Sequence, residues 1–271
     1  MAKRPIIFAV ANQKGGVGKT TTAVNLAASL AAAERPTLLV DLDPQANASS
    51  GVGVAPGTAD RTIYDALIGH CRLSEVIVKT GIETLDLAPA SQDLTAVEYE
   101  LFDENRGTHL RKVLHSEDAE KYDYIIIDSP PSLGVLTLNV LGAADSLIIP
   151  LQPEYYALEG ITYLMATVDR VRASLNPDLK VEGIVLTMWD GRNKLAHEVA
   201  DQVRAHFHVF ESIIPRNVRL SEAPSHGLPA LLYDVQSKGA QGYLTLAREV
   251  LDLGPGIAAI RPPNTGRVET A

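Results

Sequence analysis

The sequence predicts a single α/β domain with a doubly wound, mostly parallel sheet that helices cover on both faces. Short, continuously apolar runs alternate along the chain with segments whose apolar residues recur every three or four positions. Continuous apolar runs are typical of strands buried on both faces, and strands that alternate with helices are typical of parallel sheets. No linker rich in Ser, Gly or Pro interrupts the chain before its end, which favours one domain over two.

The first half of the chain opens with an apolar strand at residues 6–11, followed by a glycine-rich turn and a helix over 20–32. A second buried strand is predicted at 37–40, and the β-branched run at 124–128 is the strongest strand in the sequence. The other elements expected here are a loop over 47–60, short helices over 62–68 and 73–78, a weaker strand at 84–88, and mixed helical spacing over 94–114 that Gly107 interrupts.

The second half continues the alternation. Residues 157–174 place apolar side chains three or four apart, which predicts a helix with one buried face. Prolines and glycines from Pro255 onward predict a flexible tail, so the expected folded domain spans 1–254 and the tail spans 255–271. The remaining elements are helices over 135–142, 195–206 and 241–253, and strands at 146–150, 181–188 and 212–214.

Composition places the chain among ordinary globular proteins. Of its 271 residues, 46% are apolar and 21% are charged, which suffices for a sizeable core. The single cysteine, Cys71, excludes a disulfide within one chain and indicates a reducing compartment. No apolar run has the length of a signal-peptide core or a membrane span, so we expect a cytoplasmic protein. The net charge of −9 argues against a globally basic nucleic-acid binder but does not exclude a local basic patch.

Residues 13–21 have the pattern of a phosphate-binding loop. Between a strand and a helix, backbone N–H groups converge on an anion and the helix dipole adds positive potential there. Lys19 is expected to neutralise the β and γ phosphates, and the Thr20 hydroxyl to coordinate Mg²⁺. The residues expected to bind the nucleotide here are Lys14, Gly15, Gly16, Val17, Gly18, Lys19, Thr20 and Thr21.

Three acids follow predicted strands and are expected near the phosphates. Asp41 and Asp43 come after the strand at 37–40, and Asp128 ends the strand at 124–128. Carboxyl ends of parallel strands share one sheet edge, where open α/β sheets place their ligands. Asp41 and Asp128 are therefore candidates for the Mg²⁺ shell and Asp43 for positioning the attacking water. The alternative for Asp41 and Asp43 is a pair of loop acids that cap the next helix.

The run K-G-G-x-G-K-T-T from Lys14 to Thr21 resembles the deviant Walker A loop of the ParA/MinD ATPases. The common Walker A pattern has a glycine where this chain has Gln13. Longer blocks are similar to the chromosomal ParA (Soj) branch in particular, and the resemblance spans residues 6–253. These blocks are D-L-D-P-Q from Asp41, D-S-P-P-S-L-G from Asp128, P-L-Q-P-E-Y-Y-A-L-E-G from Pro150, and I-P-R-N-V-R-L-S-E-A-P-S-H-G from Ile214.

The resemblance implies a P-loop NTPase fold of the deviant Walker A type that binds ATP or ADP with Mg²⁺ and hydrolyses ATP slowly. It implies that Lys14 reaches the ATP of the other subunit in a nucleotide-sandwich homodimer. It also gives the second acid of the D-x-D motif, Asp43, the role of positioning water, and it places Pro215 and Asn217 beside the adenine. The catalytic residues expected are Lys14, Lys19 and Asp43.

The resemblance further implies non-specific binding of double-stranded DNA through Arg192 and Arg219, with Lys238 as a weaker candidate. The ATP dimer of such a protein coats the nucleoid, and a ParB (Spo0J)-like partner stimulates hydrolysis during chromosome or plasmid segregation. The residues alone favour surface arginines paired with Asp190 and Glu222, and it is the resemblance that reverses this preference.

Other proteins with a phosphate loop define the alternatives. A MinD-type protein would end in a basic amphipathic membrane helix, whereas prolines break residues 254–271, so no membrane contact is expected. A nitrogenase-reductase-like protein needs two cysteines per subunit for a shared iron–sulfur cluster, and this chain has only Cys71. The remaining alternatives are a ParA-like ATPase that positions a protein cargo and a biosynthetic enzyme of the amidoligase kind.

Overall fold

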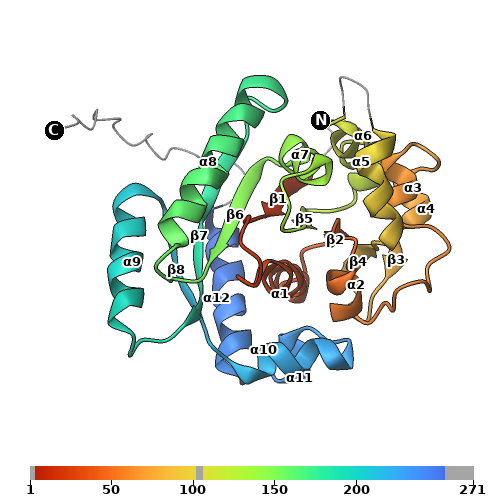
Figure 1. Cartoon of the computed structure of the whole chain (residues 1–271). Helices are drawn as coiled ribbons and strands as arrows, with labels where there is room; N and C mark the ends of the chain where they lie inside the picture. The colour runs from red at the N-terminus through yellow and green to blue at the C-terminus, as the bar shows by residue number, and fades with distance from the viewer. Residues whose placement is uncertain (1–3, 102–105, 254–271) are drawn as a thin grey trace.

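A computed structural model describes residues 4–101 and 106–253, and a single sheet crosses it (Figure 1). The strands are β1 (Ile6–Val10), β2 (Thr37–Asp41), β3 (Val78–Lys79), β4 (Leu85–Ala88), β5 (Tyr124–Asp128), β6 (Ser146–Leu151), β7 (Lys180–Trp189) and β8 (Val209–Pro215). Their order in the sheet is β3-β4-β2-β5-β1-β6-β7-β8. All neighbours are parallel except β3 and β4. The predicted doubly wound, mostly parallel sheet is confirmed.

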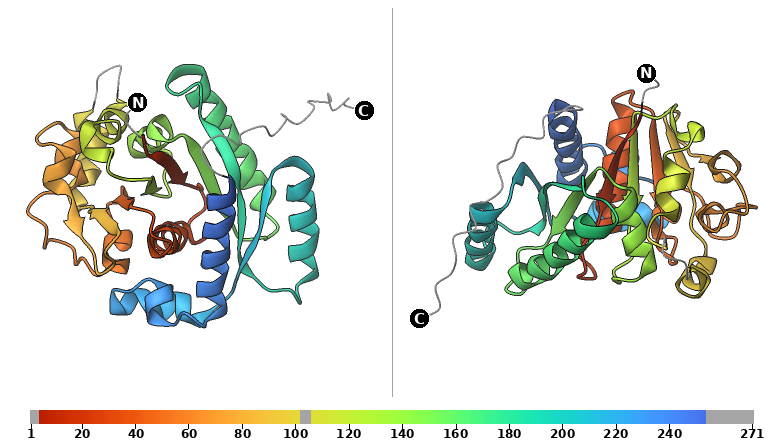
Figure 2. Two further views of the ribbon diagram at one scale, coloured as in Figure 1. Left: turned by 180° about the vertical axis from the view of Figure 1, so that it is seen from behind. Right: turned by 90° about the horizontal axis from the view of Figure 1, so that it is seen from above.

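Helices lie on both faces of the sheet, and the view from above in Figure 2 shows these layers. The longer helices are α1 (Lys19–Ala32), α7 (Val135–Ala143), α8 (Ala157–Ser174), α9 (Lys194–His206) and α12 (Lys238–Leu253). The shorter ones are α2 (Asn47–Gly51), α3 (Ile63–Leu67), α4 (Leu73–Val76), α5 (Val97–Glu100), α6 (His109–Leu114), α10 (Val218–Glu222) and α11 (Ala230–Tyr233), with 3₁₀ turns η1 (Gln92–Ala96), η2 (Glu117–Ala119) and η3 (Ala223–His226).

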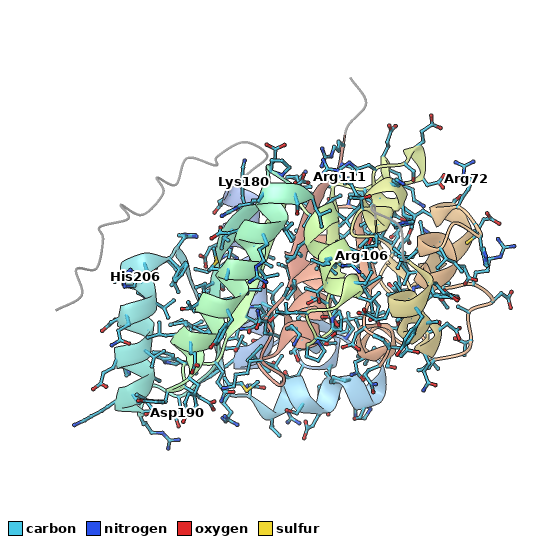
Figure 3. All side chains as sticks on the ribbon, turned by 45° about the horizontal axis from the view of Figure 1, so that its top comes forward. Arg72, Arg106, Arg111, Lys180, Asp190 and His206 are labelled. Carbon is cyan, nitrogen blue, oxygen red and sulfur yellow. The ribbon has the colours of Figure 1, made fainter. Side chains whose placement is uncertain are left out.

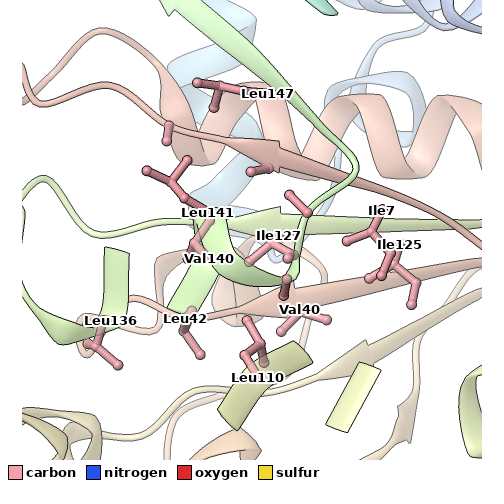
Figure 4. Close-up of a cluster of buried hydrophobic side chains, with 14 of the residues drawn as sticks. Ile7, Val40, Leu42, Leu110, Ile125, Ile127, Leu136, Val140, Leu141 and Leu147 are labelled. Atoms are coloured by element: carbon pink, nitrogen blue, oxygen red, sulfur yellow. The ribbon is translucent and has the colours of Figure 1, made fainter. Parts of the chain in front are cut away.

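The central strand shows why both faces must be covered. Successive side chains of a strand point to opposite faces. Ile7 and Ala9 of β1 belong to a core shared with α7 and α8, whereas Phe8 and Val10 belong to a core shared with α1 and α12. Figure 4 shows part of the first core, where Ile7 and Ile127 of the sheet meet Val140 of α7. An all-apolar strand is stable only between two such cores.

The structure corrects three local predictions. The predicted helix over 73–78 ends at Val76, and the next residues form the edge strand β3, antiparallel to β4. The predicted loop over 47–60 begins with helix α2, which the carboxylate of Asp41 stabilises through two hydrogen bonds from Ser49. Helices α10 and α11 follow β8, where the sequence pattern predicts no element, and the side chain of Asn217 caps α10.

Three further expectations concern a membrane span, the cysteine and the C-terminal tail. Among the described residues, no helix combines the length and the apolar character needed to cross a bilayer. Cys71 is a free, half-buried thiol. The predicted tail at 255–271 lies outside the described residues, so the domain boundary at residue 254 stays a prediction.

Candidate nucleotide site

The register of the parallel strands brings the predicted site residues together. In the sheet, Asp128 at the end of β5 lies level with Asp41 of β2 on one side and with Val10 of β1 on the other. The glycine-rich loop follows β1 directly and leads into α1. In the sheet, β2 to β5 lie on one side of β1 and β6 to β8 on the other. The loop after β1 therefore lies where the strand order changes direction. This is the place where open α/β sheets bind ligands.

The backbone of the loop requires glycine and leaves open space in front of it. Gly16 and Gly18 have φ angles of 73° and 89°, in the left-handed region that favours glycine. A Cβ added at Gly15 or Gly16 would meet no atom within 4 Å. The loop is supported from behind, because the Thr187 hydroxyl of β7 donates a 2.8 Å hydrogen bond to the carbonyl of Val17. The result is a rigid, open cradle of backbone N–H groups, as an anion site requires.

The start of the loop is held equally firmly. The buried Asn12 side chain donates from Nδ2 to the carbonyl of Pro150 (2.8 Å) and accepts from the N–H of Lys14 (3.0 Å). The Ser129 hydroxyl, one residue after Asp128, donates to the carbonyl of Val10 (2.9 Å). Both strands that flank β1 therefore hold the loop in place, so its N–H groups are preorganised.

Lys19 is the first residue of α1, and its side chain is buried within this cradle. It is 7% exposed, and its Nζ donates to the carbonyl of Lys14 at 3.3 Å. Burial lowers the pKa of Lys19, while the charges of Asp128 and Asp43 act in the opposite direction. The ammonium group thus faces the two acids across the mouth of the loop, where a phosphate would meet it.

Asp128 is the least satisfied polar group of the site. Its side chain is fully buried, and neither carboxylate oxygen has a hydrogen-bond partner of good geometry among residues 4–101 and 106–253. Burial first, and then the charges of Asp41 and Asp43, raise the pKa of Asp128 well above its usual value, although Thr20 and Lys19 act to lower it. A buried carboxylate without partners is costly, so the donor set fits a cation or its bound water.

The other two acids already accept hydrogen bonds. The two oxygens of Asp41 accept from the N–H and hydroxyl of Ser49 (2.7 Å each) and from the N–H of Asp43 (3.2 Å), and burial raises the pKa of Asp41 to about 6. Asp43 accepts at Oδ1 from the N–H of Gln45 (3.0 Å). Asp41 thus contacts the first turn of α2, whereas Asp43 closes a turn just before this helix, and of the three acids Asp128 alone has no hydrogen-bond partner of good geometry at either oxygen among the described residues.

The described residues contain no group of three or more His, Cys, Asp or Glu side chains placed to hold a metal by themselves. This is consistent with Mg²⁺, which usually takes one or two protein ligands and completes its shell with water and nucleotide phosphates. Thr20, at the start of α1, and Asp128 are the protein groups that could hold it, with Asp41 beside Asp128 in the sheet.

Lys14 has a partner that the sequence pattern does not indicate. Its Nζ lies 2.5 Å from Oε2 of Glu154, in the segment between β6 and α8, and both side chains are partly exposed. Exposed ion pairs of this kind contribute about 0–1 kcal/mol, so a phosphate could replace the carboxylate at little cost. Lys14 and Glu154 are 140 positions apart, so sequence spacing does not predict their contact. The one sequence signal near Glu154 is the family-like block that begins at Pro150.

The residues predicted to border the adenine and to bind DNA lie at the same sheet edge, after β7 and β8. Pro215 ends β8, and Asn217 accepts from the N–H of Arg219 at 2.9 Å as the N-cap of α10. Both predicted arginines have acidic partners: Arg192 pairs with Asp190 at 2.8 Å, and Arg219 with Glu222 at 2.7 Å and Asp234 at 3.3 Å. Lys238 is exposed at the start of α12.

Comparison with known sequences gives consistent matches over most of the chain. A family model described as an AAA domain matches residues 5–181. A chromosome partitioning protein ParA from Myxococcus xanthus is 57% identical over 90% of this chain and 87% of its own length. The sporulation initiation inhibitor protein Soj of Bacillus subtilis is 50% identical over 90% of this chain and 97% of its own length.

Solved structures match as well. A protein from Mycobacterium smegmatis described as a cobyrinic acid a,c-diamide synthase, with bound ADP and magnesium, is 36% identical. Its TM-score is 0.80 over 92% of this chain and 95% of that one. The cell division ATPase MinD of Pyrococcus furiosus is 28% identical, with a TM-score of 0.77 over 93% of this chain and 100% of its own.

Proposed function

The chain belongs to the ParA/MinD-type ATPases, within the group of chromosomal ParA (Soj) partition proteins, and from this membership we propose that it is an ATP-dependent dimerisation switch. It is a partition ATPase that hydrolyses ATP to ADP and phosphate, with Mg²⁺ as the metal cofactor. In our proposal the ATP dimer binds double-stranded DNA without sequence preference, and a ParB (Spo0J)-like partner stimulates hydrolysis and releases the subunits.

Each residue of the loop has a defined task in this proposal. The N–H groups from Gly15 to Thr20 bind the β and γ phosphates, and Lys19 neutralises them. The Thr20 hydroxyl and the free oxygens of Asp128 hold Mg²⁺, and Asp41 keeps α2 in position through Ser49. The bound metal supplies positive charge that offsets the charge of the transferred phosphoryl group.

The observation that supports this assignment most directly is the buried carboxylate of Asp128, which has no hydrogen-bond partner of good geometry within residues 4–101 and 106–253 and lies close enough to Lys19 to feel its charge. Native proteins rarely leave such a group unpaired, because desolvating a charge is expensive. The exception is a binding site in which the ligand supplies the missing partner of the charged group. Here the open cradle at Gly15 and Gly16 lies at the same edge of the sheet, so nucleotide and cation would complete it together.

Hydrolysis and dimerisation depend on two further residues. Asp43 is 8% exposed, and its Oδ2 has no hydrogen-bond partner among the described residues, so this oxygen can orient the attacking water. Lys14 is partly exposed and forms a weak ion pair with Glu154. Its ammonium group can therefore leave this carboxylate and bind the ATP of a second subunit. ADP lacks the γ phosphate that Lys14 would reach, so only ATP stabilises the closed dimer.

The test is binding to a duplex of arbitrary sequence, measured with ATP, with ADP and without nucleotide at two salt concentrations. We expect binding only with ATP, weaker at the higher salt, and lost in Arg219→Glu. DNA binding that is equal in all three nucleotide states would overturn the switch. The matched control is Arg204→Glu, because Arg204 is exposed on α9 at the end remote from the DNA-binding candidates.

One rival function has a specific observation in its favour, since the 36% identical protein from Mycobacterium smegmatis is described as a cobyrinic acid a,c-diamide synthase. A biosynthetic enzyme of that kind would hydrolyse ATP in proportion to a small acceptor carrying a carboxyl group. The partition ATPase would respond instead to DNA together with a ParB-like protein. Phosphate release measured with each addition separates the two, and the relatives at 50–57% identity favour the partition role. Whether the cargo is a chromosome, a plasmid or a protein assembly requires the partner to be identified.

A further inference from the structure

The loops that follow β7 and β8 are joined at one corner of the carboxyl edge of the sheet. Trp189, the last residue of β7, lies level with Pro215, the last residue of β8. The N–H of Arg216 donates a 3.1 Å hydrogen bond to the carbonyl of Trp189. The side chains of residues 190–192 and of Arg216 therefore share one surface, next to the start of α9. Figure 3 labels Asp190 at this corner and His206 at the far end of α9.

Arg192 holds Asp190 at this corner, and the charge of Arg216 lies near enough to act on the same carboxylate. Arg192 donates to the Asp190 carboxylate from Nε (3.0 Å) and Nη2 (2.8 Å), and its backbone N–H donates to the same group (3.1 Å). These hydrogen bonds, and the nearby charge of Arg216, lower the pKa of Asp190 to about 2. The Asp190 carboxylate is therefore ionised at neutral pH. The three side chains leave one positive charge in excess on a fully exposed surface.

Arg216 differs from the two arginines predicted from the sequence. Within residues 4–101 and 106–253, its guanidinium has no hydrogen bond or ion pair, and the residue is exposed. Arg192 and Arg219, in contrast, each hold a carboxylate at 2.7–2.8 Å. A guanidinium without a partner can bind a phosphate without first losing an ion pair. The backbone N–H of Arg216 is bonded to the end of β7, next to the loop that carries Arg192, and Arg219 follows three residues later in α10.

We propose that Arg216 is a phosphate contact of the DNA-binding surface and that Asp190 competes with the DNA backbone for Arg192. This inference rests on the proposed function, because it concerns the DNA that the ATP dimer binds. A phosphate that reaches this corner has to replace the carboxylate beside Arg192 or tolerate its repulsion. Asp190 therefore holds the affinity for DNA below what the arginines alone would provide, which keeps the protein dependent on closing the dimer before it binds.

Two substitutions of opposite effect test the proposal. Arg216→Ala removes one phosphate contact per subunit, so the slope of log affinity against log salt falls by about 2 for the dimer. Asp190→Asn removes the competitor and keeps the shape, so we expect the affinity to rise by about two- to tenfold. The matched controls are Arg204→Ala and Asp201→Asn, an exposed ion pair on α9 towards its remote end, and both should bind like the wild type.

The measurement is fluorescence anisotropy of a labelled duplex with the full chain and ATP, titrated at four salt concentrations. If the wild type does not bind, the proposed function itself fails. If the wild type binds but Arg216→Ala keeps its affinity and salt slope, or Asp190→Asn binds no more tightly, the present inference fails and the proposed function stands. A gain of affinity in Asp190→Asn cannot arise from misfolding, so this arm remains decisive even if Arg216→Ala is poorly folded.

Discussion

Replacing Asp128 with asparagine should stabilise the nucleotide-free protein, and the gain should grow as the pH rises. Asp128 is fully buried without a hydrogen-bond partner of good geometry, and burial raises its pKa well above the usual 3.8. A raised pKa in the folded state means that the stability of the wild type is highest below pH 3.8 and falls as the pH rises towards the folded pKa. Asparagine keeps the shape of the side chain but cannot ionise, so the variant escapes this loss.

The size of the effect follows from proton counting. Between the two pKa values of Asp128, the folded state binds about one proton more than the unfolded state. The wild type then loses about 1.4 kcal/mol of unfolding free energy per pH unit relative to the variant. The difference in stability therefore widens as the pH rises from 3.8 towards the folded pKa, and each 1.4 kcal/mol corresponds to about 3–6 °C in Tm for a domain of this size.

The assay is differential scanning calorimetry of both proteins at pH 5, 6 and 7, first without nucleotide and then with ATP and Mg²⁺. We expect the variant to melt at a higher temperature without nucleotide, and the wild type to gain more from the ligands because they satisfy Asp128. Asp201→Asn, an exposed aspartate, serves as the control with no trend. An equal pH dependence of wild type and Asp128→Asn, or a variant less stable at pH 7, would refute the reasoning.

Three further substitutions have definite expected outcomes. Asp43→Ala should lower phosphate release by about 10²–10⁴-fold and leave an ATP dimer that persists on DNA, so hydrolysis at the normal rate would remove Asp43 from its assigned role. Lys14→Ala should abolish hydrolysis while a fluorescent ATP analogue still binds the monomer, and normal turnover would contradict its role. Asn25→Ala leaves the buried N–H of Ala230 without its 2.8 Å acceptor, so urea unfolding should show a loss of about 1–3 kcal/mol, and no loss would contradict the packing of α11 on α1.

Sequence patterns predict the fold best where burial alone determines the local structure. The β-branched run at 124–128 and the apolar stripe at 157–174 coincide with β5 and α8 to the residue. The elements that the pattern misses are short and are stabilised by contacts made after folding. β3 exists only as the partner of β4, α10 needs the cap from Asn217, and α2 needs the carboxylate of Asp41.

In the candidate site, too, the sequence predicts some features and tertiary contacts determine the others. The spacing of the loop and the ends of the strands suffice to predict that Lys19, Asp41 and Asp128 meet at one edge, because the register of a parallel sheet brings them level. The difference between the two acids is not visible in the pattern. Asp41 is satisfied by Ser49, eight residues away in a helix that the pattern predicts as a loop, whereas Asp128 is not satisfied. The ion pair of Lys14 with Glu154 likewise depends on tertiary structure, whereas the pair of Arg192 with Asp190 is one that the sequence itself suggests.

The central claim, that ATP closes a dimer through Lys14, is tested most directly by the molar mass in solution. Sedimentation velocity of Asp43→Ala, which we expect to hold ATP without turning it over, would be measured with ATP, with ADP and without nucleotide. The double variant Lys14→Ala/Asp43→Ala would be measured in the same three states. The account predicts twice the monomer mass with ATP alone, and a monomer in every state of the double variant. The same mass with ATP and with ADP, or a dimer that forms without Lys14, would contradict it.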